Sequence, residues 1–477
     1  MSDALELWHL PGLDADDPAL CSGWIEGRTA AGRAFRVPAP TAEGAALIAG
    51  EVRRAALQAR GERSLAEVVH SVATAAGRLA EASASAGGEA VRLLADEQGW
   101  SEPLAQETLA EMGRIWTEES LWRVLRSELP DPLVLEEFRV DPEVRDGLPE
   151  ASGGERRRRA SGPPLLFQIM AGNVPGVAVT ALMRGLLVRS GVLTKLPEEE
   201  PGLVVLFARH LAEVDPLLAL SLAATWWPAE EENPLWSEWT SEAGRLVVYG
   251  GEAAVLGVRG RARADQEIIS YGPKLGVGVI LPGADVPAAA GALACDVCAY
   301  EQQGCVSPRL VFVLGSAEPF ANELAGALAR ETERLPRRPL RPDEAVAIRS
   351  ARAEVEFLGY AQGASRVLAS ERDLAWTVLL DDPPCLEVEP LPRVVRVSCV
   401  GTLEILKRLI GPLSGRIQAL GYAGDGGLLR PLAEVATDLG VGRLAPLGRL
   451  AWPPADWRHD GRYQLLPLLT WTDWEAE

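Results

Sequence analysis

The chain has 477 residues, with 47 Lys plus Arg against 67 Asp plus Glu, which gives a net charge of −20. A single hydrophobic core stops growing well below this length, so the sequence predicts two or three domains. So acidic a chain repels phosphate backbones and anionic headgroups, which disfavours nucleic-acid binding and attachment to a membrane surface.

The N-terminus, MSDALELWHLPGLDADD, lacks a basic segment followed by an apolar run, so we expect no secretory signal. The best candidate for a membrane span, PGVAVTALMRGLLVRSGVL, carries Arg184 and Arg189 and is therefore interpreted as part of a globular core. The six cysteines are sparse, and three of them are isolated, at Cys21, Cys385 and Cys399. We expect a cytoplasmic protein without structural disulfides.

Residues 1 to about 150 are rich in Ala, Glu, Arg and Leu, with helical periodicity in stretches such as TAEGAALIAGEVRRAALQA. This composition predicts a mostly helical N-terminal region. The next segment, SGGERRRRASGPP at 152–164, combines Gly, Ser and Pro with a charge run. It is interpreted as an exposed loop or domain boundary with solvated arginines, and contact with a phosphate or a carrier protein is the alternative.

Short apolar runs then alternate with helix-length segments. Strands are predicted at 165–172, 191–196, 245–250, 267–272 and 276–281. Strand, helix and strand in repetition indicate a parallel sheet covered on both faces, for which a nucleotide-binding fold is the default. The GVG at 276–278 is not a dinucleotide fingerprint, because it lies inside a strand and not ahead of a helix.

A second alternating region follows. Its predicted elements are a helix at 286–302, a strand at 309–315, a helix at 318–335, and strands near 376–382 and 392–400. From about residue 403 we expect one more helix-strand unit, ending at 443–448, and then a tail rich in Trp and Pro.

Three cysteines lie close together in the second region. Asp285 and Pro287 mark a helix start, and Cys295 and Cys298 are three residues apart on that helix, where we interpret both as buried, inert thiols. The spacing C-x2-C-x6-C matches neither zinc nor iron–sulfur patterns. Cys305 differs, because Gly304 should end the helix and Ser307-Pro308 should hold the chain extended. A nucleophile at the rim of a sheet is the hypothesis for Cys305, and a loop cysteine without a role is the alternative.

The pieces AGNVPG, GVLTKLPEEEP, VVYGGEAAV, IISYGPKLGVGVI, EQQGCVSPRL and WRHDG occur in this order between residues 160 and 477. As a set they resemble the long-chain acyl-CoA reductase (LuxC-like) family, a divergent branch of the aldehyde dehydrogenase superfamily. The resemblance implies an α/β, aldehyde-dehydrogenase-like fold with a Rossmann-type cofactor domain and an α/β domain that carries the cysteine. The expected divisions are a helical region at 1–155 packed on the cofactor domain, a dinucleotide-binding domain at 156–284, a catalytic domain at 285–410, and a return segment at 411–477 that completes the cleft.

Three residues are the expected catalytic set. Cys305 matches the nucleophile of the family, although Gln303-Gly304-Cys305 departs from the usual order of Gly-Gln, residue, Cys. Asn173 matches the asparagine whose amide holds the substrate oxygen as charge develops there, and a helix N-cap ahead of Pro175 is its alternative role. His459 in WRHDG is the candidate acid, base or substrate contact; a plain turn with Asp460 bonded to the following backbone is the alternative.

The resemblance also implies a nicotinamide cofactor. Lys195 matches the lysine that reaches the adenosine ribose or its 2′-phosphate. Gly250 and Gly251 follow a strand and open a helix, where backbone N–H groups can approach a pyrophosphate, although a plain turn needs glycines too. Gly272 is assigned to the same site. The expected cofactor is NADPH, with NADH as the alternative because the three glutamates at 198–200 lie beside Lys195.

Hydrolytic aldehyde dehydrogenases carry Glu-Leu-Gly-Gly where this chain has Ser270-Tyr271-Gly272-Pro273. Without that glutamate a thioacyl group persists, and the expected reaction is reduction of a fatty acyl thioester, on coenzyme A or an acyl-carrier protein, to an aldehyde through Cys305. Expected partners are an acyl-activating enzyme and further copies of the chain. The rivals are a Cys305/His459 acyltransferase or thioesterase that uses no nicotinamide, and a non-catalytic scaffold.

Overall fold

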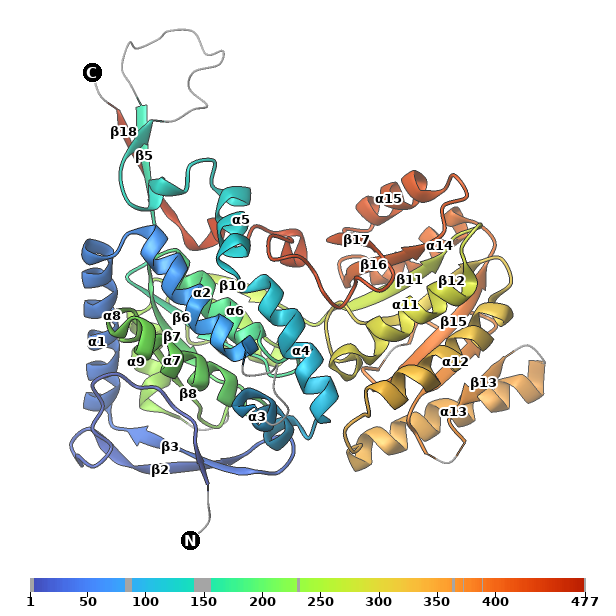
Figure 1. Cartoon of the computed structure of the whole chain (residues 1–477), viewed down its shortest axis with the longest axis horizontal. Helices are drawn as coiled ribbons and strands as arrows, with labels where there is room; N and C mark the ends of the chain where they lie inside the picture. Colours follow the sequence, from blue (N-terminus) through green and yellow to red (C-terminus); the bar gives the residue numbers. More distant parts are fainter. Residues whose placement is uncertain are drawn as a thin grey trace. The chain divides into compact units, whose positions relative to one another are not determined.

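The computed structural model describes residues 4–81, 88–140, 156–229, 232–362, 365–371, 373–387 and 389–475. The chain forms two compact units (Figure 1). The first unit contains residues 1–98, 109–272 and 463–477, and the second contains 99–108 and 273–462. Across these described ranges, no helix is both long and apolar enough to cross a membrane.

The first unit begins with a small sheet, which the sequence analysis did not predict. Strands β1 (Leu5–Glu6), β2 (Cys21–Arg28) and β3 (Ala34–Pro40) pair in the order β1-β3-β2. Side-chain exposure in β2 alternates with the period of two that is typical of a strand. The prediction missed this strand because it assigned the whole N-terminal region from the helical periodicity of the residues that follow. From residue 42 the helical prediction is confirmed, by α1 (Ala42–Glu62), α2 (Leu65–Glu81), α3 (Glu89–Gln98), α4 (Glu102–Ile115) and α5 (Glu118–Glu128).

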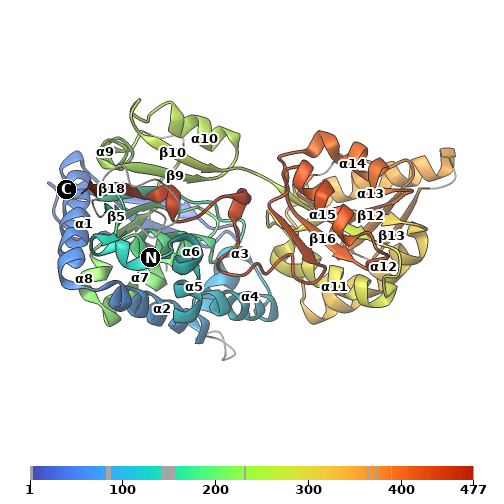
Figure 2. The same ribbon diagram turned by 90° about the horizontal axis from the view of Figure 1, so that it is seen from above.

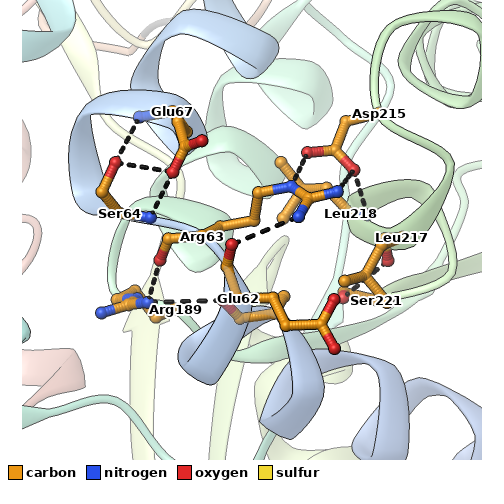
Figure 3. Close-up of polar contacts among 10 residues, drawn as sticks. Glu62, Arg63, Ser64, Glu67, Arg189, Asp215, Leu217, Leu218 and Ser221 are labelled. Atoms are coloured by element: carbon orange, nitrogen blue, oxygen red, sulfur yellow. Dashed lines mark hydrogen bonds and ion pairs between the residues drawn. The ribbon is translucent and has the colours of Figure 1, made fainter.

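Helices α1 and α2 meet at a tight junction that polar side chains hold (Figure 3). Ser64 and Glu67 form a capping box: Ser64 N donates to Glu67 Oε2 (2.7 Å), and Glu67 N donates to Ser64 Oγ (3.2 Å). The Arg189 guanidinium donates to the carbonyl oxygens of Arg60 and Arg63 at the end of α1. Arg63 in turn pairs with Asp215, 2.8 Å away. The junction therefore fixes both helices against the sheet that follows.

The central sheet of the first unit has five parallel strands in the order β10-β9-β6-β7-β8. Four of them are confirmed predictions, and their bounds are β6 (Leu165–Ile169), β7 (Gly191–Lys195), β9 (Arg245–Tyr249) and β10 (Glu267–Tyr271). Strand β8 (Leu222–Thr225) was missed, because it follows α7 (Gly202–Val214) and α8 (Pro216–Ala219) within one apolar run that resembles a long helix.

Helices cover both faces of this sheet, as predicted. On one face α1 and α9 (Pro234–Glu242) pack through Ile48 and Trp239 against Phe167 of β6. On the other face lie α6 (Val177–Leu187) and α7. A Cβ on Gly185 of α6 would lie 2.7 Å from Val192 Cγ2, so the absence of a side chain there allows close packing of helix on sheet.

The prediction of an exposed loop at the four consecutive arginines is wrong. They form strand β5 (Arg156–Ser161), which pairs antiparallel with β18 (Thr470–Glu475) on one side (Figure 1). On its other side β5 pairs antiparallel with the short β4 (Arg139–Val140). The Arg158 guanidinium lies 5.7 Å from the ring centroid of Trp471 on β18. The partner strand β18 lies some 300 residues away in the chain, so no local pattern reveals this pairing. The first four residues of the predicted loop, 152–155, lie outside the described ranges.

The second unit is built on a seven-stranded sheet in the order β13-β14-β15-β12-β11-β16-β17, in which only the pairing of β13 with β14 is antiparallel. The strand predicted at 276–281 lies here as β11, and not with the strands of the cofactor sheet. The tail contains one more helix-strand unit than predicted. The bounds are β11 (Leu275–Ile280), β12 (Pro308–Leu314), β13 (Arg366–Ala369), β14 (Thr377–Asp381), β15 (Val394–Val400), β16 (Ile417–Ala423) and β17 (Arg443–Pro446).

Helices also cover both faces of the second sheet (Figure 2). Helices α14 (Leu403–Ile410) and α15 (Leu429–Asp438) bury Leu406 and Leu432 against Val277 and Val279 of β11. Helices α11 (Val286–Cys298) and α12 (Ala317–Arg334) lie on the opposite face, and α13 (Pro342–Gln362) packs beside β13 and β14. The segments that carry Cys305 and His459 meet at the amino-terminal edge of this sheet.

Candidate active site

The chain reaches Cys305 through an unusual turn. Helix α11 was predicted to run to about residue 302, but it ends at Cys298 and is followed by a 3-10 turn. In that turn Tyr300, Glu301 and Gln302 have φ angles of 52°, 53° and 62°. Residues with a Cβ avoid this left-handed region, and three in succession persist only where the surroundings hold them.

Buried side-chain contacts hold these three residues. Arg393 Nη2 donates to Glu301 Oε1 (2.7 Å), and both side chains are wholly buried. Gln302 bonds twice with β15, since its Oε1 accepts from Val394 N (2.8 Å) and its Nε2 donates to Val394 O (2.8 Å). The Tyr300 hydroxyl donates to Ala451 O (3.0 Å). The turn before Cys305 is thus tied to the neighbouring strand and to the segment that leads towards His459.

Cys305 is the second residue of a turn that Ser307 N closes on Gly304 O (3.1 Å). Strand β11 lies directly against this turn: a Cβ on Gly276 would be 2.3 Å from Val306 O. Gly276 N also donates to Ser307 O (2.9 Å). Gly276, in the GVG run that was interpreted as part of a strand, is therefore the residue that lets β11 approach the cysteine turn. Sequence reasoning missed this role, although a glycine within a strand is a known sign of close backbone approach.

His459 lies beside Cys305, with 3.7 Å between Cys305 Sγ and His459 Nε2. Its ring stacks on Trp457, with centroids 5.0 Å apart. The WRHDG segment does form a turn, in which Asp460 has a φ of 56°. The Asp460 carboxylate, however, lies 3.4 Å from Lys274 Nζ. The segment is both a turn and a side-chain contact for Cys305.

Helix α11 also anchors the chain that leads to His459. Asp296 on α11 accepts backbone N–H groups from Gly448 (2.6 Å), Leu450 (2.9 Å) and Ala451 (3.1 Å). Burial raises the pKa of the Asp296 carboxyl to about 6, although the three N–H groups oppose that shift. One helix therefore positions both the cysteine turn and the segment of the histidine.

The Cys305 thiol is protonated at neutral pH. Burial, and then the nearby Asp460, raise its pKa to about 12, while its own backbone N–H, Lys274 and Arg309 act in the opposite direction. Only a thiolate is an effective nucleophile, so the thiol needs a base when substrate arrives. His459 Nε2 is placed to accept that proton.

The other two cysteines of this region differ from each other. Cys298 is buried, and burial raises its pKa to about 12, in agreement with an inert thiol. Cys295 is exposed on α11, so its predicted burial is wrong. Within the described part of the chain, no three His, Cys, Asp or Glu side chains gather as ligands for a metal.

Asn173 lies in the first unit, as an exposed residue of the otherwise largely buried loop between β6 and α6. Its alternative role as a helix cap is wrong, because the N-cap of α6 is Gly176 with a φ of 81°. Gln98 holds this loop from α3 by donating from Nε2 to Gly172 O (2.9 Å).

The predicted cofactor residues follow the carboxyl ends of three strands in the same unit. Lys195 ends β7, and its Nζ lies 5.3 Å from the ring centroid of Trp227. Burial lowers its pKa to about 8, although Glu198 and Glu199 oppose the shift. Gly250 and Gly251 follow β9, and Gly251 is the N-cap of α10 (Glu252–Arg259). Gly272 follows β10.

This arrangement fits a dinucleotide. The strand order reverses between β6 and β9, and ligands of open parallel sheets bind beyond the strand ends at such a point. A Cβ added at Gly251 would meet nothing within 4 Å, so the backbone at the start of α10 is open to a phosphate. Glu200, one of the three glutamates near Lys195, is buried and accepts from Leu203 N (3.2 Å), which leaves Glu198 and Glu199 as the exposed acids.

Comparison with known proteins gives a family match over most of the chain. The model of the family described as acyl-CoA reductase (LuxC) matches residues 61–471. A long-chain acyl-protein thioester reductase of Aliivibrio fischeri is 28% identical over 239 residues, which are 50% of this chain and 49% of that protein. The enzyme of the same name from Vibrio harveyi is 26% identical over 254 residues, 53% of this chain and 52% of that protein. The chain spans about half the length of the curated relatives it matches.

Solved structures show the fold. Aldehyde dehydrogenase 21 from Physcomitrella patens has a TM-score of 0.73 at 13% identity, covering 99% of this chain and 98% of that one. A methylmalonate-semialdehyde dehydrogenase from Sinorhizobium meliloti, complexed with NAD, has a TM-score of 0.72 at 14% identity, covering 100% of this chain and 98% of that one. The α/β, aldehyde-dehydrogenase-like fold class is therefore confirmed.

Proposed function

The chain belongs to the LuxC family of acyl-CoA reductases, and from this premise we propose that it reduces a long-chain acyl thioester to the aldehyde through an acyl group carried on Cys305. The observation that carries the proposal is the 3.7 Å approach of His459 Nε2 to Cys305 Sγ. A half-buried thiol with a raised pKa needs a proton acceptor at contact distance, and this histidine is one.

In the acylation step, Cys305 Sγ gives its proton to His459 Nε2 and attacks the thioester carbonyl. The tetrahedral intermediate collapses by breaking the bond to the departing sulfur, which takes the proton from His459 and leaves as a thiol. The product of this step is a thioester on Cys305. After reduction of that thioester, the carbon–sulfur bond to Cys305 breaks and the aldehyde leaves. The first proton has already left with the departing thiol, so the Cys305 sulfur takes up a new proton from water, by way of His459.

Asn173 is the proposed side-chain donor to the carbonyl oxygen, with the backbone N–H of Cys305 as the second donor. One fixed donor at a developing oxyanion lowers the barrier by about 3 kcal/mol. Ser270 occupies the place where hydrolytic relatives in the superfamily carry glutamate, so no base of that kind activates water, and the acyl group survives until reduction.

A bound nicotinamide dinucleotide supplies the hydride. Gly250, Gly251 and Gly272 are the proposed backbone contacts, and Lys195 is the proposed contact for the ribose or its 2′-phosphate. A cationic Lys195 favours NADPH over NADH. Replacing Lys195 with Ala should raise the KM for NADPH about tenfold more than the KM for NADH, because only NADPH carries the 2′-phosphate.

The name of the relatives, long-chain acyl-protein thioester reductase, supports a long acyl chain and a thioester on a protein, and the family's description as acyl-CoA reductase supports a thioester on coenzyme A. We propose both as acyl donors, with an acyl-activating enzyme as a partner that loads the carrier and a homo-oligomer as the working form. The predicted helical, cofactor, catalytic and return segments stay part of this proposal, except that the cofactor segment ends near residue 272, because β11 belongs to the second unit.

The test of the function follows NADPH absorbance and free thiol together after addition of a long-chain acyl-CoA. Reduction predicts equal amounts of NADPH consumed, thiol released and aldehyde formed, all abolished in Cys305→Ala. The Cys305–His459 pair would equally suit an acyltransferase or thioesterase. That alternative predicts thiol release without NADPH consumption, and a scaffold protein predicts neither.

A further inference from the structure

Two charged side chains adjoin the Cys305–His459 pair, and nothing above assigns them a role. Lys274 lies directly before β11, and its Nζ is 3.4 Å from Asp460 Oδ1. The same Oδ1 is 3.8 Å from His459 Nε2, which in turn is 3.7 Å from Cys305 Sγ. The Asp460 side chain is only 6% exposed and that of Lys274 17%, so water screens these charges weakly.

We propose that Lys274 and Asp460 are positioning residues, an opposed pair of charges that controls when the Cys305 thiol ionises and that holds His459 towards it. This inference rests on the proposed role of Cys305 as the acyl carrier. Before substrate binds, the Lys274 ammonium and the Asp460 carboxylate compensate each other beside the uncharged thiol of Cys305. No net charge is then buried at the site.

Proton transfer from Cys305 Sγ to His459 Nε2 gives four charged groups whose neighbours have opposite signs: the Lys274 ammonium, the Asp460 carboxylate, the His459 imidazolium and the Cys305 thiolate. The new thiolate has Lys274 as a nearby cation, and the new imidazolium has Asp460 as a neighbouring anion. In a weakly screened site such an arrangement favours the ion pair that attack requires, without a thiolate that persists at rest. The effects on the pKa of Cys305 have the signs that this arrangement requires, since Asp460 raises that pKa and Lys274 lowers it.

Two further charged side chains, Arg309 and Arg462, act on Cys305 and Asp460. Arg309, near the start of β12, also lowers the pKa of Cys305, and its buried Nε meets no acceptor among the described residues. Burial raises the pKa of Asp460, and Lys274 and then Arg462 oppose that shift. Both arginines stay in place in the variants below, so their fields are constant across the comparison.

The experiment measures the alkylation rate of Cys305 by iodoacetamide at pH 8, with peptide mapping, in Asp460→Asn and in Lys274→Met/Asp460→Asn. Asp460→Asn leaves the cation beside the sulfur, so the rate should rise about tenfold, the equivalent of one pKa unit. Removing Lys274 as well should lower it about tenfold from that raised value. The charges of Lys274 and Asp460 interact, so the effect of one depends on the other. The ratio of the alkylation rates of Asp460→Asn and the double variant therefore measures the effect of the Lys274 charge alone.

Lys274→Arg keeps the charge and should alkylate at the wild-type rate. The matched control is Lys407→Met, which breaks the exposed Lys407–Asp438 pair of the same unit and should change nothing. Cys298 reports on folding, because it stays protected only while the unit is intact. Equal rates in Asp460→Asn and the double variant, with Cys298 protected, would overturn the proposal. Alkylation needs no thioester reduction, so a protein with these shifts but without NADPH consumption would contradict the proposed function and not this inference.

Discussion

Arg393 Nη2 donates to Glu301 Oε1 over 2.7 Å, and neither side chain has any exposed surface. Glu301 is the middle of three left-handed residues that precede the cysteine turn, and Arg393, itself at a φ of 53°, stands at the start of β15. The buried pair therefore joins the strained turn to the sheet. The pair serves to position the turn, because the cost of removing two charges from water largely cancels the attraction between them, and the net gain in stability is small.

Removing one partner of this pair should be costly. Arg393→Met leaves the Glu301 carboxylate buried without its cation, and we expect a loss of about 3–5 kcal/mol in the free energy of unfolding. The matched control is Arg366→Met, which breaks the exposed Arg366–Glu318 pair in the same unit and should cost at most about 1 kcal/mol. Urea denaturation measures both. Similar losses in the two variants would show that the buried pair has no special role.

Gly276→Ala should disturb the cysteine turn from the neighbouring strand. The added methyl group would lie 2.3 Å from Val306 O, so backbone must move, at a cost of about 1–3 kcal/mol. Gly291→Ala in α11 is the control, since a Cβ there meets nothing within 4 Å and alanine favours helix by about 1 kcal/mol. Thermal denaturation should move in opposite directions for the two variants. A Gly276→Ala protein as stable as wild type would argue against the close approach.

His459→Gln should slow acylation without preventing binding. A general base contributes about 10²–10⁴-fold to the rate of a step in which it takes a proton, and a glutamine cannot take one. Single-turnover mixing with acyl-CoA, followed by mass spectrometry of the Cys305 adduct, measures the step. His70→Gln, at an exposed histidine paired with Glu118, is the control and should leave the rate unchanged. Wild-type acylation in His459→Gln would remove the base from the mechanism.

The pH dependence of Cys305 alkylation follows from its raised pKa. Because the pKa is about 12, the thiolate is a minor form at neutral pH, and its fraction grows about tenfold for each pH unit below that value. The alkylation rate should therefore increase about 100-fold between pH 7 and pH 9 without a plateau. A plateau beginning near pH 6 would mean that a thiolate–imidazolium pair exists in the resting protein.

Much of this architecture could be predicted from the sequence, because the strands of both sheets are short apolar runs flanked by turn residues. Strand β8 could not, since the apolar pattern of α7 continues into it. Strand β5 could not either, because its arginines become strand residues only through pairing with β18. The early end of α11 depends on Arg393 and Val394, which lie about 90 residues further along the chain.

The site itself was predicted in part. Cys305 and His459 were named as candidates, and the structure brings them together within the second unit. Lys274, Asp296 and Gly276 were missed as parts of it, since each acts through a tertiary contact that no spacing in the sequence reveals. Asn173, Lys195 and the three glycines stay predictions for the reaction.

The most direct test of the account is intact-mass spectrometry of the full chain after incubation with a long-chain acyl-CoA, first without and then with NADPH. We expect one acyl group on Cys305, absent from Cys305→Ala and stable towards water. Addition of NADPH should discharge it as aldehyde. Aldehyde formation by Cys305→Ala, or an acyl group that sits on another residue in the active protein, would contradict the claim that this sulfur carries the acyl chain.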